Sequence, residues 1–417
     1  MKEIRFLIAI MFIVTLPLSV RAQQDDVSTA VEEIKSQVEG MDEAIKELQT
    51  DRDRLKKLKI SGYVQMNWEQ TEAEQGFAVD PYDPSDEISS RFRLRRARLK
   101  FTYTETFGRM VVQADFGNTK LELKDAYFEF NEPWLRMFSL RMGVFNRPNY
   151  EVEYSSSQRE SVERSTVVRT LYPGERDLGA MLTVAPEDLF TLQVAAFNNT
   201  HLGTYAQGNP SYGSEPLYFM TRLTKSFMLG DVGLDLGAHA RIGNARLNTQ
   251  RVITSASPAS GADAIIDSTT YAIGDGVARN WYGVEMQVYY DFLGGMKLLG
   301  EYITGSDVNQ LSTAVPPAPA RLREFSGWYV MLVKNVGTDF QAAVKYDRFT
   351  PNTTIADADI STTAELPRGT LGVGLHNYTF ENVRLTVWYE MNSWNTTERF
   401  ETDPKDNLLV LRAQYKF

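Results

Sequence analysis

Apolar and polar residues alternate with a period of two from Lys59 to the end of the chain. The pattern begins with ISGYVQMN over residues 60–67 and is still present in LRAQYKF over 411–417. A period of two places alternate side chains on opposite faces of a β-strand. We predict sixteen strands, over residues 59–68, 89–104, 109–117, 121–131, 137–145, 177–185, 189–198, 216–227, 232–242, 280–292, 295–304, 323–334, 338–348, 368–378, 383–394 and 407–417.

The connections between these segments form two sets that alternate along the chain, apart from a short link near Asn118. The short set includes residues 186–188, 293–294 and 335–337, and the long, polar set covers 69–88, 146–176, 199–215, 243–279, 305–322, 349–367 and 395–406. Short turns at one end and long loops at the other are typical of outer-membrane β-barrels, which have an even number of strands. A soluble β-sandwich has no reason to sort its loops in this way. The predicted fold is all-β: a 16-stranded antiparallel transmembrane β-barrel over residues 59–417, preceded by a short N-terminal α-helix.

Charged residues share one phase of these strands, opposite to the apolar residues. Glu285, Arg384 and Arg412 are examples from three different strands. An Arg or Lys facing lipid at mid-membrane costs about 2–4 kcal/mol, so these charges are expected to face the interior. Because unpaired ions are too costly to bury in a dry core, we expect the interior to hold water.

The segment 89–104 is the most basic of the predicted strands. Arg96, Arg98 and Lys100 share its inward phase, whereas Arg91, Arg93 and Arg95 have the opposite phase. We therefore expect a bulge near Arg95, or an upper part of the strand that has left the membrane. The other interpretation, a nucleic-acid patch, is disfavoured because the period is two.

The connection 146–176 is far longer than an ordinary hairpin loop. Apolar residues are spread through it, which argues against disorder, and long ordered loops are usually functional. It also carries five arginines and no lysine: Arg147, Arg159, Arg164, Arg169 and Arg176. Our hypothesis is a loop folded into the barrel that narrows a water-filled channel and places guanidinium groups along it. The alternative is a lid of salt bridges, because five acidic residues lie in the segment and Asp177 follows it directly.

Residues 1–22 have the pattern of a secretory signal peptide. Lys2 and Arg5 precede an apolar run from Phe6 to Leu18, and Ala22 gives a plausible cleavage site. A membrane-spanning anchor is the alternative, but such a helix needs about twenty apolar residues and Pro17 interrupts this shorter run. We therefore expect cleavage.

Residues 23–58 change to a heptad pattern. The apolar seam consists of Val31, Ile34, Val38, Met41, Ile45, Leu48 and Leu55, with Glu and Lys at the outer positions. This is the pattern of a short coiled coil. We expect self-association, for example as a trimer stalk in the periplasm. The alternatives are a helix lying on the rim of the barrel or a tether frayed at Gly40.

Composition excludes several classes of function. The chain of 417 residues has no cysteine and three scattered histidines, so no disulfide, thiol catalysis or local metal cluster is expected. The net charge of -10 argues against a nucleic-acid partner. Aromatic residues make up 12% although the mean hydropathy is only -0.32, a combination that fits a membrane barrel.

Three other functions were weighed against a channel. A barrel hydrolase would need a nucleophile or base beside a histidine, for which His376 is the only faint candidate. An energised receptor needs a large plug before the barrel, and only about thirty-five helical residues precede it. A structural or adhesive barrel without transport would be separated by conductance measurements.

Several motifs resemble the phosphate-selective porins O and P. They are ISGYVQ from Ile60, RRARLKF from Arg95, GVFNRP from Gly143, the ERS of 163–165 and PGERDLG from Pro173. Arg164 and Arg176 fall within these motifs, whereas Arg147, Arg159 and Arg169 share the loop without individual matches. The closing residues Tyr415 and Phe417 are similar to the terminal aromatic signal that the outer-membrane assembly machinery reads.

The resemblance implies a sixteen-stranded homotrimeric porin whose third long loop folds inward, with arginine and lysine along an anion path. We therefore expect passive diffusion of small hydrophilic solutes across the bacterial outer membrane, with a preference for phosphate-like anions. The expected partners are these solutes, outer-membrane lipid and the assembly machinery. No enzyme activity, cofactor or metal is expected.

Overall fold

The computed structural model describes residues 24–72, 89–117, 121–198, 216–247, 249–253, 266–267, 270–291, 293–309, 320–355, 360, 365–397 and 400–417. The expected signal peptide at 1–22 lies outside these residues. So do the tips of several long loops, including 73–88 and 199–215. The chain divides after Leu58 into two compact units, which are described separately.

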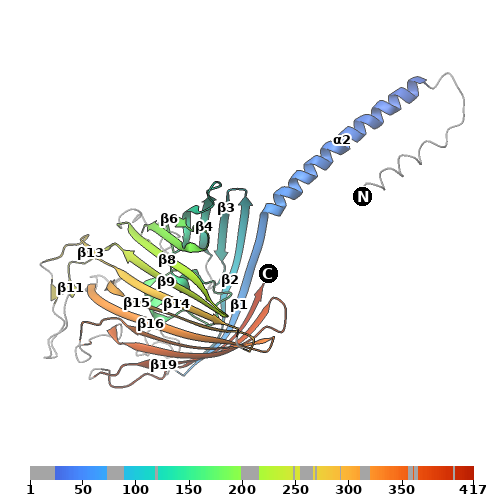
Figure 1. The fold of residues 1–417 in the computed structure, drawn as a ribbon. Helices are drawn as coiled ribbons and strands as arrows, with labels where there is room; N and C mark the ends of the chain where they lie inside the picture. Colours follow the sequence, from blue (N-terminus) through green and yellow to red (C-terminus); the bar gives the residue numbers. More distant parts are fainter. Residues whose placement is uncertain are drawn as a thin grey trace. The chain divides into compact units, whose positions relative to one another are not determined.

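The second unit is a closed barrel of sixteen antiparallel strands (Figure 1). Each strand pairs with the barrel strand before it, and β20 pairs with β1 to close the wall. The strands are β1 (Leu58–Thr71), β2 (Ser90–Glu105), β3 (Gly108–Asp115), β4 (Glu122–Asn131), β5 (Phe138–Asn146), β6 (Arg176–Val184), β7 (Thr191–Phe197), β8 (Tyr218–Leu229), β9 (Val232–Ile242), β14 (Trp281–Tyr290), β15 (Met296–Asn309), β16 (Ala320–Val336), β17 (Phe340–Thr350), β18 (Arg368–Asn377), β19 (Val383–Trp394) and β20 (Leu408–Lys416).

The predicted fold class is confirmed, and every predicted strand is present. The main differences lie at the long-loop end, where β1, β15 and β16 are longer than expected. The ladder between β15 and β16 continues to the pair of Asn309 with Arg321. An ion pair of 3.0 Å between Arg323 and Asp307 joins the two strands there. Polar residues therefore extend these strands beyond the region in which apolar alternation marks them.

The long polar connection 243–279 contains four short strands that the sequence analysis did not predict. It contains the hairpin of β10 (Asn244–Arg246) with β13 (Gly276–Ala278). It also contains β11 (Val252–Ile253), which pairs with β12 (Ile266–Asp267) and runs parallel to β16. Strands of two or three residues are too short for a period of two to register in the sequence.

Side chains alternate across the barrel wall as the sequence predicts. On β14, Tyr282 and Val284 are exposed on the outer face, whereas Glu285 is buried on the inner face. Arg384 and Arg412 are also buried on the inner face of their strands. Each of these two arginines donates to a backbone carbonyl of the segment between β5 and β6. The outer belt is therefore apolar and the interior is charged.

Strand β2 changes phase at Arg95 and Arg96, close to where the sequence predicts a bulge. Phe92 points outward before this position and Phe101 does so after it. Arg95 and Arg96, although consecutive, both bind the interior residue Glu163. As a result, the arginines from both halves of the strand face the interior.

The first unit contains the helix α2 (Gln24–Lys57). Val38, Met41, Leu48 and Leu55 of the predicted heptad seam have exposed side chains. Among the described residues, no helix combines the length and the apolar character that crossing a membrane requires. An exposed apolar seam on a long helix is the surface that a coiled coil buries.

Candidate functional site

The connection between β5 and β6, residues 147–175, lies inside the barrel. On one wall, the hydroxyl groups of Ser156 and Tyr63 of β1 are 2.5 Å apart. On another wall, the indole of Trp281 on β14 donates to the hydroxyl of Tyr172 at 3.0 Å. The segment contacts walls that belong to distant parts of the chain and therefore crosses the interior.

An apolar surface fixes one side of this inward loop. The short helix α4 (Thr166–Leu171) contacts β16 and β17. Val167, Val168 and Leu171 are almost fully buried there. They belong to one hydrophobic cluster with wall residues that include Phe325, Tyr329, Phe349 and Trp281. Burial of each such aliphatic side chain contributes about 1.5–3 kcal/mol, so the loop has one strongly preferred position.

Glu151 joins the two helical turns of the loop to the barrel wall. It lies in α3 (Tyr150–Glu153), which Asn149 caps by accepting a hydrogen bond from the amide of Val152. The Glu151 carboxylate accepts hydrogen bonds from the amide and hydroxyl of Ser165, at the start of α4, at 2.9 and 2.5 Å. Burial would raise the pKa of Glu151, but Lys345 and Arg159 hold it below its ordinary value.

Four loop acids pair with cations on four different strands. These pairs are Glu151 with Lys345 of β17, Glu153 with Arg222 of β8, Glu160 with Lys297 of β15, and Glu163 with Arg95 of β2. The nitrogen–oxygen distances lie between 2.5 and 2.9 Å. The acidic residues thus attach the loop around the wall, and their negative charge is largely compensated there.

Two of the predicted site arginines, Arg147 and Arg159, are buried and bind backbone carbonyls. Arg147 donates to the carbonyl of Pro173 at 2.6 Å. Arg159 donates to the carbonyls of Ser161 and Val162. Burial, with the nearby positive charges of Arg164 and Arg96, lowers the pKa of Arg159. These contacts hold the loop backbone in shape.

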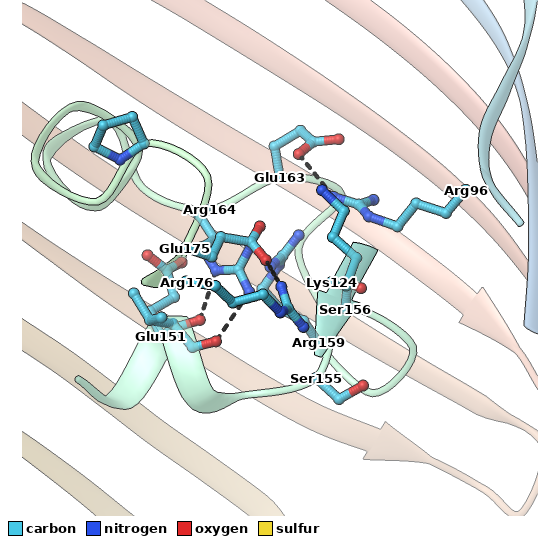
Figure 2. A network of polar contacts seen from close by, with 12 residues as sticks. Arg96, Lys124, Glu151, Ser155, Ser156, Arg159, Glu163, Arg164, Glu175 and Arg176 are labelled. Carbon is cyan, nitrogen blue, oxygen red and sulfur yellow. Dashed lines mark hydrogen bonds and ion pairs between the residues drawn. The ribbon is translucent and has the colours of Figure 1, made fainter. Parts of the chain in front are cut away.

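Arg164 and Arg176 are also buried, and they share Glu175 (Figure 2). Arg164 also donates to the carbonyl of Glu151 at 2.7 Å, and Arg176 binds Asp125 of β4 at 2.8 Å. Burial would raise the pKa of Glu175, but the two arginines hold it well below its ordinary value. This network ties the end of the loop to its beginning and to the wall.

Arg169 differs from the other four predicted loop arginines because its side chain is exposed. It lies in the last turn of α4. The one hydrogen bond of its side chain to a described residue is a contact of 3.5 Å with the Thr166 hydroxyl. It is therefore the loop arginine that can meet a solute.

Three guanidinium groups surround the carboxylate of Glu163. Arg95 lies at 2.6 Å, Arg96 at 3.5 Å and Arg412 at 3.7 Å, and Figure 2 shows Arg96 reaching it. Burial would raise the pKa of Glu163, but these cations hold it well below its ordinary value. With one carboxylate for three arginines, the local charge is positive.

The guanidinium groups around Glu163 are not saturated with hydrogen bonds. Arg159 and Arg412 both donate to the carbonyl of Val162, so they are neighbours. Arg384 donates to the carbonyl of Arg159 at 3.2 Å. Within the described part of the chain, one nitrogen each of Arg96, Arg159, Arg384 and Arg412 has no hydrogen-bond partner.

The predicted basic residues of β2 occupy the inner face. Arg96 and Arg98 are buried, and Arg98 binds Asp115 of β3 at 2.8 Å. Lys100 follows in the same phase and is half-buried. No carboxylate of a described residue lies within ion-pair distance of Lys100.

The sequence reasoning placed Arg384 and Arg412 inward but did not include them in the site. It also missed Arg95, Lys345 and Arg222, which bind loop acids. For Lys345 and Arg222 the available signal was the inward phase of each residue on its strand, because an inward cation can meet an inward-folded loop. Arg95 has the opposite phase in the sequence, and the change of phase on β2 brings it to the interior. Which acid each cation meets depends on contacts between distant segments.

His376, the candidate for a hydrolase, is buried on β18. Its Nδ1 atom lies 2.9 Å from the hydroxyl of Thr386 on the neighbouring strand. Within the described residues, no group of three or more His, Cys, Asp or Glu residues has the arrangement of a metal site.

A closed barrel with an apolar belt, a charged interior and an inward loop is an outer-membrane channel. The family model for phosphate-selective porin O and P matches residues 82–417. The chain belongs to this porin family and is a bacterial outer-membrane protein. No curated protein matches the chain.

Several solved structures have a similar fold. OprB of Pseudomonas putida has a TM-score of 0.62 at 9% identity, with 88% of this chain and 96% of that chain covered. The outer membrane channel DcaP of Acinetobacter baumannii has a TM-score of 0.55 at 12% identity, with 86% and 97% covered. The anion-selective porin from Comamonas acidovorans has a TM-score of 0.54 at 9% identity, with 86% and 99% covered.

Proposed function

We propose that this porin lets small hydrophilic solutes diffuse passively and favours anions, including phosphate-like ones. The observation that carries this proposal is the imbalance at Glu163, where three arginines surround one carboxylate. Lys100 and Arg169 add positive charge that no described carboxylate compensates at ion-pair distance. The acidic residues of the loop, in contrast, are engaged by wall cations.

Arginine suits such a role because its planar group binds two oxygens of a phosphate or carboxylate at once. A transport site must also release its solute, which favours weak and repeated contacts over one tight site. Arg169, with its exposed side chain, and half-buried Lys100 fit this requirement. The buried loop arginines support the constriction by holding its shape.

The test is a charge reversal at the two accessible cations, in the variants Lys100→Glu and Arg169→Glu. We expect the reversal potential in a potassium chloride gradient to show a higher relative permeability to cations in each variant. The change should be larger in the double variant. Lys405→Glu, in the exposed segment after β19, is the matched control. Unchanged reversal potentials in the double variant would contradict the proposed selectivity.

Arg164 and Arg176 are less suitable for this test, although the family motifs contain them. Both are buried in the network around Glu175. A glutamate at either position would place two carboxylates together in a buried site, which is strongly unfavourable. Such variants would report on loop packing and not on selectivity.

We also propose that three copies associate and that α2 lies in the periplasm. The support is the exposed seam of α2, with Leu48 and Leu55 among its apolar residues. Residues 1–22 would then act as the cleaved signal peptide that directs export. The C-terminal Tyr415 and Phe417, both exposed on the outer face, would be the signal for outer-membrane assembly.

A further inference from the structure

A cavity of about 1020 Å³ lies at the short-turn end of the barrel. Its wall includes residues of β8, β9, β14 and β15, and the loop residue Glu160 contributes to it. Tyr289 and Tyr290 add aromatic surface, and Asn335 and Gln341 add amides. The cavity is therefore large enough for a small organic solute.

The charge of this cavity is opposite to that around Glu163. Five carboxylates line it against two lysines: Glu160, Glu187, Asp231, Asp235 and Asp291 against Lys225 and Lys297. One of the lysines, Lys297, is already engaged by Glu160 at 2.5 Å. The remaining lining is negative, so the cavity attracts cationic groups.

Glu160 contributes to the lining of this cavity, and one of its carboxylate oxygens is buried and unpaired among the described residues. Its Oε1 atom accepts hydrogen bonds from Lys297 at 2.5 Å and from the hydroxyl of Tyr154 at 3.2 Å. Its Oε2 atom has no hydrogen-bond partner among the described residues. The residue is only 5% exposed, and a buried carboxylate oxygen without a donor is costly. An ammonium group in the cavity would supply the missing donor.

The turn at Arg159 and Glu160 separates the two regions of opposite charge. Glu160 lines the acidic cavity. The carbonyl of Arg159 accepts a hydrogen bond from Arg384 at 3.2 Å. The guanidinium groups of Arg159 and Arg412 both donate to the carbonyl of Val162. Two consecutive loop residues therefore border a negative cavity and a positive cluster.

We propose that the preferred solutes are zwitterions, such as amino acids and short peptides. Their ammonium group would enter the field of the acidic cavity, and their carboxylate would enter the field of the arginines. A simple anion is attracted only by the arginines and a simple cation only by the cavity, whereas a zwitterion is attracted by both. This inference rests on the proposed porin function and specifies its substrate class.

The test compares two solutes of similar size that differ in one charge. Glycylglycine carries an ammonium and a carboxylate group, whereas N-acetylglycine carries the carboxylate alone. Each is added to the full-length protein in planar bilayers, and its competition with the chloride current is measured. We expect glycylglycine to compete about fivefold more effectively, the effect of one charge contact of about 4 Å in water.

The variant Asp231→Asn combined with Asp291→Asn removes two carboxylates from the cavity lining. Both side chains are exposed, so the barrel is expected to fold. We expect the competition by glycylglycine, relative to that by N-acetylglycine, to fall toward a ratio of one. The variant Asp235→Asn should lower this ratio as well. Glu381→Gln is the control, because Glu381 is exposed in a short turn at the same end and does not line the cavity.

Equal competition by the two solutes in the unmodified protein would overturn the inference. An unchanged ratio in both cavity variants would do so as well. The proposed anion preference is measured separately, as the reversal potential in potassium chloride. A chloride preference without solute discrimination would therefore leave the porin function standing and remove only the zwitterion proposal.

Discussion

Lys345 of β17 and Glu151 of the inward loop form an ion pair of 2.9 Å in which both side chains are buried. We expect Lys345→Met to leave Glu151 buried without its counter-charge, which destabilises such a site by about 3–5 kcal/mol. The loop should then move, so the open-channel current should become larger and noisier. Single-channel recording measures both properties.

The matched control for this variant is Lys405→Met, which removes an exposed lysine from the segment before β20. It should leave the current unchanged. An unaltered current in Lys345→Met would show that the loop does not depend on this pair.

The ion pairs of Glu163 and Glu175 in the loop should persist in mildly acidic conditions. Glu163 and Glu175 have pKa values well below the ordinary value, which is about 4.3 for glutamate. A carboxylate with a lowered pKa contributes stability above its unfolded pKa and loses it as the pH falls through its folded pKa. Burial raises the pKa of Glu153, so the variant Glu153→Gln removes the loop acid that can be protonated earlier. The conductance of this variant should therefore be constant from about pH 7 to about pH 5 and change only below the ordinary glutamate pKa. A transition near neutral pH would contradict this assignment of charges.

The apolar seam of α2 should be required for the association of chains but not for the folding of the barrel. We expect Leu48→Glu with Leu55→Glu to weaken oligomers, because charges at inner heptad positions oppose coiled-coil packing. Crosslinking of the purified protein measures association, and heat-modifiable migration on a gel reports that the barrel remains folded. Thr50→Glu, at the outermost position of the heptad and exposed on α2, is the control. Intact oligomers in the seam variant would exclude α2 as the association surface.

The barrel could be predicted from the sequence because lipid and the charged interior impose opposite demands on alternate residues. Glu285, Arg384 and Arg412 were expected inside on this ground, and they lie there. The two-residue strands β11 and β12 were missed because so short a segment carries no period. The ordered loop was predictable from its length and from apolar residues such as Val167 and Leu171.

The individual roles of the loop arginines could not be predicted in the same way. All five were expected along a channel, but the structure exposes Arg169 and buries the other four. Their environment depends on pairing between distant segments: Glu151 and Lys345 are 194 positions apart. Local pattern carries no information about such pairs. Only the inward phase of Lys345 hinted that it could meet the loop.

The inward loop rests on the place where the first and last strands of the barrel meet. Ser156 contacts Tyr63 of β1, and the carbonyl of Ser157 accepts a hydrogen bond from Gln414 of β20. This seat does not exist until the C-terminal strand has joined the N-terminal one. The part of the loop around Ser156 and Ser157 can therefore take this position only in the closed barrel, once β20 has paired with β1.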